Sequence, residues 1–199
     1  MLSERSVVLD FEGFRHKKQN FILKEVAVCS EDCIDSFLLL PPTNLSSLSD
    51  SEQKSYHWLT KQLHGLCWAH GDYFYADLTR ILQSYVLRYP KAVFYAKGLE
   101  KSVLFSHLLD RPVVDLDSIG CPKIEDIKCF KKDRACENHL PAQCVAQLRK
   151  HCAKEKALVY FNWLKHEQSR ISETGSEFIK QFNTLRVDTS VGDSPYSNK

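Results

Sequence analysis

Hydrophobic side chains in the first forty residues occur in short runs that polar segments separate. Runs of this length, rich in Val, Ile, Leu and Phe, are typical of buried strands. They predict three strands, over residues 6–11, 21–28 and 36–40, the last of them ended by two prolines. Because the connecting segments are short, we expect the three strands to form an antiparallel meander.

After the prolines the hydrophobic spacing becomes that of helices. Ser49 and Glu52 have capping-box spacing and predict the start of a helix that runs to about Leu63. A second helix is predicted between Gly71 and Pro90, because apolar residues recur there on one helical face. These residues are Leu78, Ile81, Leu82, Tyr85 and Val86.

The rest of the chain alternates between the two patterns. The elements predicted there are strands over 92–96 and 112–116 and helices over 100–109, 139–151 and 153–167. Beyond about residue 171 the apolar periodicity is lost. We therefore expect one domain over residues 1–170 and a mobile C-terminal tail over 171–199. The order of elements resembles that of the ribonuclease-H-like α/β fold, in which helices flank a mixed sheet of a three-strand antiparallel meander and two further strands.

Composition limits the classes of protein and partner. The chain has 27 Lys and Arg against 25 Asp and Glu, so strong nonspecific binding of nucleic acid does not follow from its net charge. No apolar run is long enough to cross a bilayer, and the first residues lack the apolar centre of a signal peptide. We therefore expect an intracellular protein, cytoplasmic or nuclear, with no membrane partner.

Two acids lie at the end of the first predicted strand. Asp10 and Glu12 are two residues apart, so strand alternation puts both carboxylates on the same face. Adjacent carboxylates repel each other unless a cation lies between them, which makes the pair a candidate divalent-metal site. The alternative is an edge strand with two solvated acids, and the spacing alone favours that alternative.

The cysteines are the second candidate for metal chemistry. In a chain without a signal peptide, eight cysteines argue against a disulfide framework. Cys136, His139 and Cys144 supply three zinc-type ligands within nine residues. The fourth ligand would come from elsewhere in the fold, with Glu100, Cys129 and Glu12 as candidates. The alternative is that three ordinary core or surface residues lie close together by chance.

Four short motifs occur in the order found in the DEDD-type 3′–5′ exonuclease superfamily, which the chain resembles over residues 6–152. The sequence Leu-Asp-Phe-Glu at 9–12 is similar to the Asp-x-Glu motif on the first strand of that family. The remaining three are Leu-His-Gly-Leu at 63–66, Tyr-Ala-Lys-Gly at 95–98 and Val-Val-Asp-Leu at 113–116.

The resemblance implies a two-metal nuclease site. In that family four acids hold two divalent cations, magnesium or manganese, and a histidine serves as general base. Asp10 and Glu12 match the first acid pair, Asp115 or Glu100 would supply a further acid, and His139 matches the base. Two features depart from the family: the second-motif acid is missing, with Lys97 and Lys101 flanking Glu100 instead, and Cys144 replaces the last aspartate.

With a cysteine at the position of the last aspartate, the chain resembles the Maelstrom domain of the piRNA pathway. That domain resembles an exonuclease whose catalytic acids are lost and in which a Glu-Cys-His-Cys zinc set is present. The resemblance implies that Cys136, His139 and Cys144 bind a structural zinc, with Glu100 as the acid.

These observations lead to three functional hypotheses. The preferred one is an exonuclease-related domain with a degenerate catalytic site and a structural zinc, which binds RNA or another single-stranded nucleic acid or interacts with protein partners. The second is an active 3′–5′ exonuclease on RNA or single-stranded DNA that uses Asp10, Glu12, Asp115 or Glu100, and His139 with magnesium or manganese. The third is an interaction module with neither metal nor nucleic acid.

Overall fold

The structure is a computed structural model that describes residues 5–16, 20–127, 136–139 and 151–187, with the side chains of Asn20 and of 172–187 left out of the description. These residues form two units. The first is Met1–Trp163, which contains the sheet and the candidate site, and the second is Leu164–Lys199. None of the helices in the described ranges is long and apolar enough to cross a membrane.

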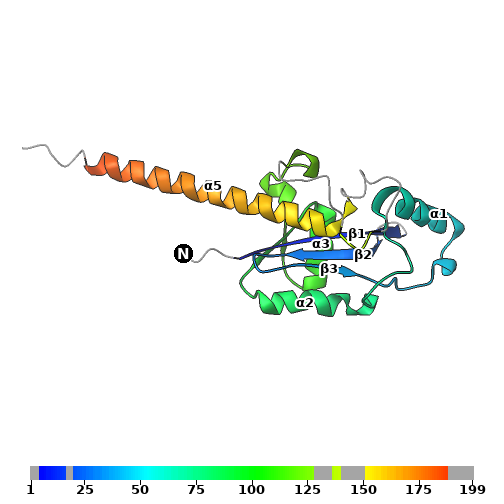
Figure 1. Cartoon of the computed structure of the whole chain (residues 1–199). Coiled ribbons are helices and arrows are strands. Elements are labelled where there is room, and N and C mark those ends of the chain that lie inside the picture. Colours follow the sequence, from blue (N-terminus) through cyan, green and yellow to red (C-terminus); the bar gives the residue numbers. More distant parts are fainter. Residues whose placement is uncertain (1–4, 17–19, 128–135, 140–150, 188–199) are drawn as a thin grey trace, which may run out of the picture. The chain divides into compact units, whose positions relative to one another are not determined.

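A five-stranded mixed sheet forms the centre of the first unit, with the strand order β3-β2-β1-β4-β5 (Figure 1). The first three strands form an antiparallel meander, as predicted, and β4 and β5 continue the sheet parallel to β1. The strands are β1 (Ser6–His16), β2 (Asn20–Cys29), β3 (Ile34–Leu38), β4 (Val93–Ala96) and β5 (Val113–Asp115).

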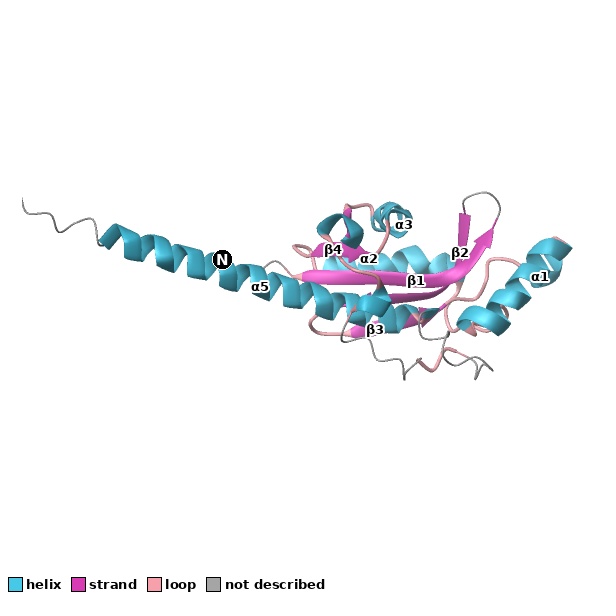
Figure 2. Ribbon diagram, turned by 90° about the horizontal axis from the view of Figure 1, so that it is seen from above, coloured by secondary structure: helices cyan, strands magenta, loops and turns pink. Residues whose placement is uncertain are grey.

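Helices lie on both faces of the sheet. The helices α2 and α3 cover one face, and the first turns of α5 lie over the other (Figures 1 and 2). The main helices are α1 (Asp50–Leu59), α2 (Leu78–Arg88), α3 (Leu99–Leu109) and α5 (Ala153–Val187). The molecule is thus an α/β protein, as the alternation of strand and helix patterns predicts.

Strand alternation divides the side chains of β1 between the two faces. Val7, Leu9 and Phe11 are buried with Leu82 of α2 and Phe105 of α3 in the main hydrophobic core. Asp10 and Glu12 therefore point to the opposite face, where α5 begins. The apolar alternation thus fills one face with core residues and leaves the two acids together on the other.

The first strand extends five residues beyond its predicted end. Its pairing with β2 continues through a bulge between Glu12 and Gly13 and reaches His16 opposite Asn20. A side chain at Gly13 would place its Cβ 2.3 Å from the carbonyl oxygen of Ile22, so only glycine fits this close approach of the two strands. The acid pair consequently lies in the middle of a long strand and not at its end.

Two helix boundaries differ from the sequence pattern for local reasons. The capping box of Ser49 and Glu52 is present, but α1 gives way after Leu59 to a wider π turn that Gly65 ends with a φ of 65°. The second helix begins only at Leu78, because the backbone of residues 72–73 pairs with residues 38–40 instead. That pairing also explains why β3 ends at Leu38.

The C-terminal helix is longer than predicted. Helix α5 runs to Val187 and so includes much of the segment expected to be a mobile tail from residue 171. Apolar residues at 171, 178, 182 and 185 are spaced seven, four and three apart, which is compatible with one face of a helix. The helix predicted over 139–151 falls almost wholly outside the described residues.

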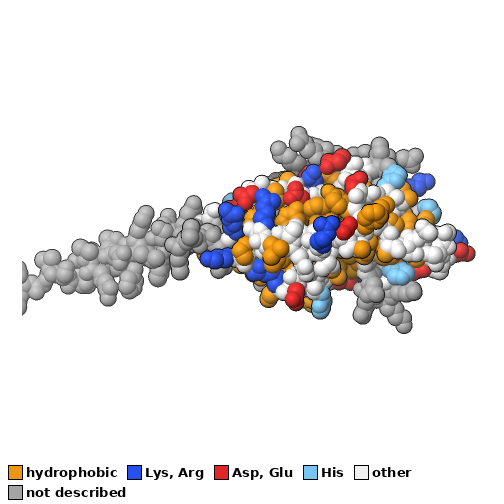
Figure 3. Space-filling model, turned by 90° about the horizontal axis from the view of Figure 1, so that it is seen from below, with side chains coloured by type: hydrophobic (Ala, Val, Ile, Leu, Met, Phe, Trp, Pro, Cys, Tyr) orange, Lys and Arg blue, Asp and Glu red, His pale blue; other side chains and the backbone are white. Residues whose placement is uncertain are grey.

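The surface on the α2 side carries mixed side chains. Hydrophobic groups lie between scattered Lys, Arg, Asp and Glu residues on this face, and no continuous band of Lys and Arg crosses it (Figure 3). A surface that binds the phosphates of nucleic acid usually presents such a band.

Candidate metal centre and the neighbouring acid pair

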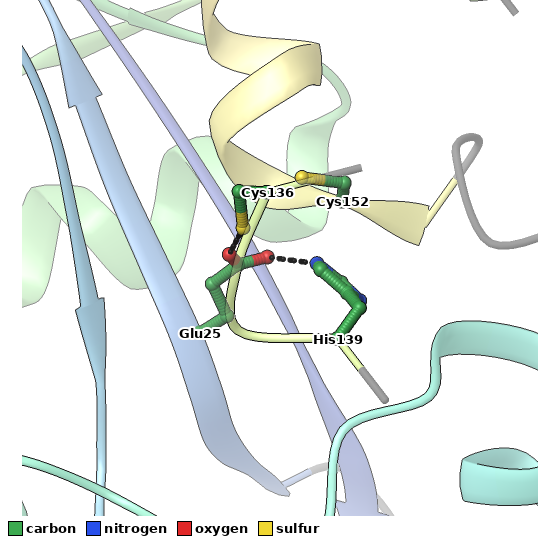
Figure 4. Close-up of side chains that lie close together, drawn as sticks. All are labelled: Glu25, Cys136, His139 and Cys152. Carbon is green, nitrogen blue, oxygen red and sulfur yellow. Dashed lines mark hydrogen bonds and ion pairs between the residues drawn. The ribbon is translucent and has the colours of Figure 1, made fainter. Parts of the chain in front are cut away.

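Four side chains from three parts of the chain meet beneath the start of α5 (Figure 4). Glu25 comes from β2, Cys136 and His139 come from one turn, and Cys152 is the residue before α5. One potential ligand atom from each residue lies within 4.8 Å of those of the other three. In tetrahedral zinc sites ligand atoms are about 3.3–3.8 Å apart, given metal–ligand bonds of about 2.0–2.3 Å. The Glu25 oxygens already lie 2.9 Å from the Cys136 Sγ and 3.2 Å from the His139 Nε2, and no pair of ligand atoms exceeds 4.8 Å, so shifts of about 1 Å, some outward and some inward, would give a tetrahedral site.

Local structure positions each of these ligands. The amide of His139 donates to the carbonyl of Cys136 at 3.4 Å, and this turn brings both side chains to the same side. The amide of Lys156 donates to the carbonyl of Cys152 at 3.0 Å, which makes Cys152 the residue from which α5 begins. Glu25 lies on the same face of the sheet as Glu12, its direct cross-strand neighbour in the β1–β2 pairing.

The Glu25 carboxylate is fully buried and surrounded by donors. It accepts hydrogen bonds from the Cys136 thiol at 2.9 Å, the Asn138 amide at 3.1 Å and the first backbone amide of α5, that of Ala153, at 2.7 Å. Burial by itself would raise the pKa of Glu25, but these donors and His139 lower it to about 2. Glu25 is therefore an anionic oxygen ligand at neutral pH.

His139 has the orientation of a metal ligand. Its Nδ1 donates to the carbonyl oxygen of His64, which leaves Nε2 facing the group. Nε2 is buried 3.2 Å from an oxygen of Glu25, yet it has no hydrogen bond of acceptable geometry. The hydrogen bond of Nδ1 orients the ring so that Nε2 faces one carboxylate and two thiols. This arrangement suits a zinc ion bound in the space between the four side chains.

The two thiols have opposite pKa shifts. The pKa of Cys152 is lowered to about 6 by its interactions with Cys136 and His139, against the opposing effect of burial. The pKa of Cys136 is raised by its interactions with Cys152 and Glu25 and by burial, which all favour its protonated form. One thiolate is thus present at neutral pH, and a metal ion would displace the remaining proton.

The acid pair of β1 lies next to this group, and two lysine side chains contact its carboxylates. Asp10, of which 1% is exposed, has its Oδ1 2.6 Å from the Nζ of Lys101 and 3.0 Å from the Nζ of Lys156. Lys156 also forms an ion pair with Glu12, and Lys101 donates to the carbonyl of Phe11 at 2.8 Å. Two lysine Nζ atoms thus lie against the two carboxylates, although burial and the nearby Lys156 lower the pKa of Lys101.

These contacts control the ionisation of Glu12. Burial favours its neutral form, but the Lys156 ammonium, with help from His151 and Lys101, holds the pKa of Glu12 well below its usual range. The pKa of Lys156 is raised in turn, since burial is outweighed by Asp10 and Glu12. The Oδ2 of Asp10 is buried without a hydrogen-bond partner among the described residues.

The structure places the predicted site residues in several locations. Cys136 and His139 lie together as predicted, whereas Cys144 is outside the described residues. The acid of the metal group is Glu25 and not Glu100, which forms an exposed ion pair with Arg15 at 3.1 Å at the start of α3. Sequence spacing points to Glu100 because of its motif, but the register of β2 brings Glu25 to the cysteines instead.

The residues predicted for catalysis are also divided. Asp10 and Glu12 lie together, but His139 belongs to the metal group. Asp115 accepts hydrogen bonds from the backbone amides of Gly98 at 2.8 Å and Asp117 at 2.9 Å, and so orders the turn after β5. Lys97, expected beside the site, instead bonds Asp117 and the carbonyl of Cys121.

Sequence reasoning overlooked Glu25, Cys152 and Lys156. A signal for the first was present, because Lys24 and Glu25 are charged residues inside a run predicted to be a buried strand. Cys152 belongs to a cluster of five cysteines between residues 121 and 152, but nothing in its spacing links it to β2. Comparisons with protein-family models and with curated proteins found no match for the chain.

Proposed function

We propose that this chain is a non-hydrolytic, exonuclease-related domain of the ribonuclease-H-like class that acts as a binding module and is stabilised by one zinc ion. Its class is supported by the antiparallel meander extended by two strands parallel to β1. The observation that carries the proposal is the position of the Lys101 and Lys156 ammonium groups on Asp10 and Glu12.

Two-metal hydrolysis needs carboxylates that are free to bind cations, which activate water and stabilise the leaving oxygen. Here the Nζ of Lys156 contacts both Asp10 and Glu12, and the Nζ of Lys101 contacts Asp10, so two lysine side chains take the place that cations would need. A divalent cation would have to displace a lysine that is 7% exposed and bonded to both acids, or approach it against charge repulsion. The acid pair therefore serves as an internal ion-pair network, and the domain's role is binding.

The zinc ion has a structural role in this proposal. Glu25, Cys136, His139 and Cys152 supply four ligands of the three chemical types that zinc accepts. When all four bind, no coordination position is left for a water or substrate, which is the arrangement of structural sites. The ion would join β2 and the turn at 136–139 to the start of α5.

Two measurements on the full chain test the proposal. Elemental analysis should find about one zinc per chain, with the metal lost in Cys152→Ser and kept in Cys67→Ser, which changes a cysteine outside the group. Labelled single-stranded RNA and DNA should stay intact in magnesium or manganese. Degradation that Asp10→Ala abolishes would contradict the proposal and establish the active-exonuclease hypothesis, while a stable, zinc-free protein would contradict the metal centre.

The partner of the binding module was predicted to be RNA, another single-stranded nucleic acid or a protein. Nucleic-acid binding would weaken steeply with salt, because each phosphate contact releases counterions. Fluorescence anisotropy of a labelled oligonucleotide over a range of salt concentrations measures this directly. The segment at 128–134, which contains four Lys and Arg residues, lies outside the described residues.

A further inference from the structure

A second site lies apart from the metal group, between α1 and the segments that flank it. It is a pocket of about 770 Å³, which is within the usual size range of ligand sites. Its apolar lining comes mainly from Leu40, Pro41, Leu45, Tyr56, Trp68 and Phe74. None of the residues used in the proposed zinc site or the acid pair contributes to this lining.

The aromatic part of the lining is held rigidly. The rings of Tyr56 and Trp68 stack with centroids 5.0 Å apart and planes at 12°. Phe14 packs against both rings, with centroid distances of 4.7 Å and 5.3 Å. The indole nitrogen of Trp68 donates to the carbonyl of Thr43 at 3.3 Å and so ties the 41–45 segment to this aromatic cluster. A pocket ordered before binding loses less entropy when a ligand enters.

The lining is apolar and uncharged. It contains no Lys, Arg, Asp or Glu, and its polar side chains are those of neutral groups such as Asn44, Ser46 and His57. Phe74 is 69% exposed at this site, although a phenylalanine gains most when it is covered. The Asn44 side chain makes no capping hydrogen bond in the turn that follows it, which leaves its amide available for a ligand.

The charge of the lining decides between occupants. A phosphodiester or a charged metabolite would find no counter-charge here, and desolvating an unpaired charge is costly. An uncharged aromatic or aliphatic side chain would gain apolar contact with Phe74 and Trp68. The neutral polar groups offer hydrogen bonds of the kind that a peptide backbone can use.

We propose that this pocket binds an uncharged hydrophobic side chain, preferably aromatic, presented by a protein partner. The inference rests on the proposed role as a binding module and names the class of partner. Rigid aromatic pockets that exclude water are the sites where single anchor side chains contribute most to protein–protein affinity. The interaction surface thus lies at α1 and the 40–46 segment, away from the acid pair.

The test uses isotope-labelled full-length protein with zinc bound, followed by amide NMR. N-acetylphenylalaninamide is the probe, and N-acetyllysinamide and a single-stranded oligouridylate are the charged comparisons. We expect saturable shifts at residues 40–46, 56–60 and 67–74 with the phenylalanine probe alone, with a Kd of about 1 mM. Phe74→Ala should weaken binding about 3–10-fold, as expected for the loss of one aromatic contact.

Two matched variants distinguish binding in this pocket from nonspecific binding to exposed hydrophobic side chains. Ala69→Glu places a charge among the lining residues at an exposed position and should abolish the shifts. Trp58→Ala removes a 58% exposed aromatic residue from the same helix outside the lining and should leave them unchanged. The inference would be overturned if the phenylalanine probe gave no saturable shifts, or if its shifts persisted in Ala69→Glu. It would also be overturned if the oligouridylate bound and its binding were lost in Phe74→Ala.

Failure of this inference and failure of the proposed function give different results. Zinc content and nuclease activity are measured on the same samples. A zinc-bound, inactive protein whose pocket ignores the phenylalanine probe contradicts only the inference about the partner. A protein that degrades RNA contradicts the proposed function, whatever the probe does.

Discussion

At the scale of single residues, the feature that most constrains the molecule is the concentration of carboxylates on one face of β1 and β2. Asp10 and Glu12 share that face by alternation, and Glu25 lies directly opposite Glu12. Like charges placed opposite each other in a sheet are destabilising. Each acid therefore needs a positive or donating partner, which Lys101 and Lys156 supply to the first two and the cysteine–histidine group supplies to the third.

Lys156 is the residue whose loss should cost most at the acid pair. Lys156→Met would leave Asp10 and Glu12 buried with one cation fewer, so we expect a loss of about 3–5 kcal/mol in the free energy of unfolding. Urea denaturation of the natural and variant chains measures this. The control is Lys154→Met on the same helix, whose partner Glu137 is 77% exposed at its side chain and whose loss should cost at most about 1 kcal/mol.

The same variant also tests whether a lysine occupies the place of a metal ion. Manganese at millimolar concentration should raise the unfolding midpoint of Lys156→Met and leave that of the natural chain unchanged. A variant as stable as the natural chain, or one that ignores manganese while the natural chain responds, would contradict this interpretation of the acid pair.

Glu12 should make stability depend on acid pH. Its pKa in the folded chain is lowered, chiefly because Lys156 outweighs the effect of burial. The unfolded chain therefore binds the proton first as pH falls below the ordinary glutamate pKa of 4.5, and the stabilisation, complete above that pH, is lost progressively toward the lower folded pKa. Urea unfolding between about pH 6 and pH 3 should show a shallower decline for Glu12→Gln, and an unchanged slope would contradict the assignment.

At the scale of elements, β2 organises the fold through two adjacent charged residues. Glu25 belongs to the metal group, whereas the neighbouring Lys24 contacts segments outside that group. The buried Nζ of Lys24 donates to the carbonyls of Leu39, Trp68 and His70, the second at 2.9 Å. One ammonium group thus joins β2 to the residues after β3 and to the 68–70 segment.

Replacing Lys24 should loosen these segments together. Burial lowers the pKa of Lys24 to about 8, so the charged side chain is costly, yet its removal leaves three carbonyls without this donor. We expect Lys24→Met to lower the free energy of unfolding by about 2–3 kcal/mol at neutral pH. Hydrogen exchange at the amides of Leu40 and Tyr73 should accelerate with it, whereas the exposed control Lys54→Met should change neither quantity. Unaltered exchange at both amides would show that Lys24 does not hold these segments.

At the scale of the whole molecule, the proposed zinc would join parts of the chain that are far apart in the sequence. Glu25 belongs to the centre of the meander and Cys152 to the start of the last helix of the first unit. A ligand that binds only the folded chain at about a thousand times its Kd adds about 4 kcal/mol to stability. The centre would therefore contribute a large share of the stability of a domain of this size.

Chelation should reveal that contribution. We expect EDTA to lower the thermal midpoint of the natural chain and of Cys67→Ser alike, because both retain the four ligands. Cys152→Ser, with one ligand removed, should already have the lower midpoint and should not respond to EDTA. Calorimetry with and without chelator measures all three, and a natural chain that is indifferent to EDTA would contradict a structural zinc.

The sequence by itself determined the elements and the acid pair. Strand and helix periods reflect local backbone geometry, so the three-strand meander, the capping box of α1 and the shared face of Asp10 and Glu12 follow from neighbouring residues alone. The nearness of Cys136 and His139 is equally local, since they are three positions apart in one turn.

Only the tertiary structure decided what completes each site. Glu25 is 111 residues before Cys136, and Lys156 is 144 residues after Glu12, so no local pattern links them. Their meeting depends on the register of β2 against β1 and on where α5 begins. The physical reason is that buried charges must find partners wherever the folded chain brings them, and that choice is made across the sheet and not along the sequence.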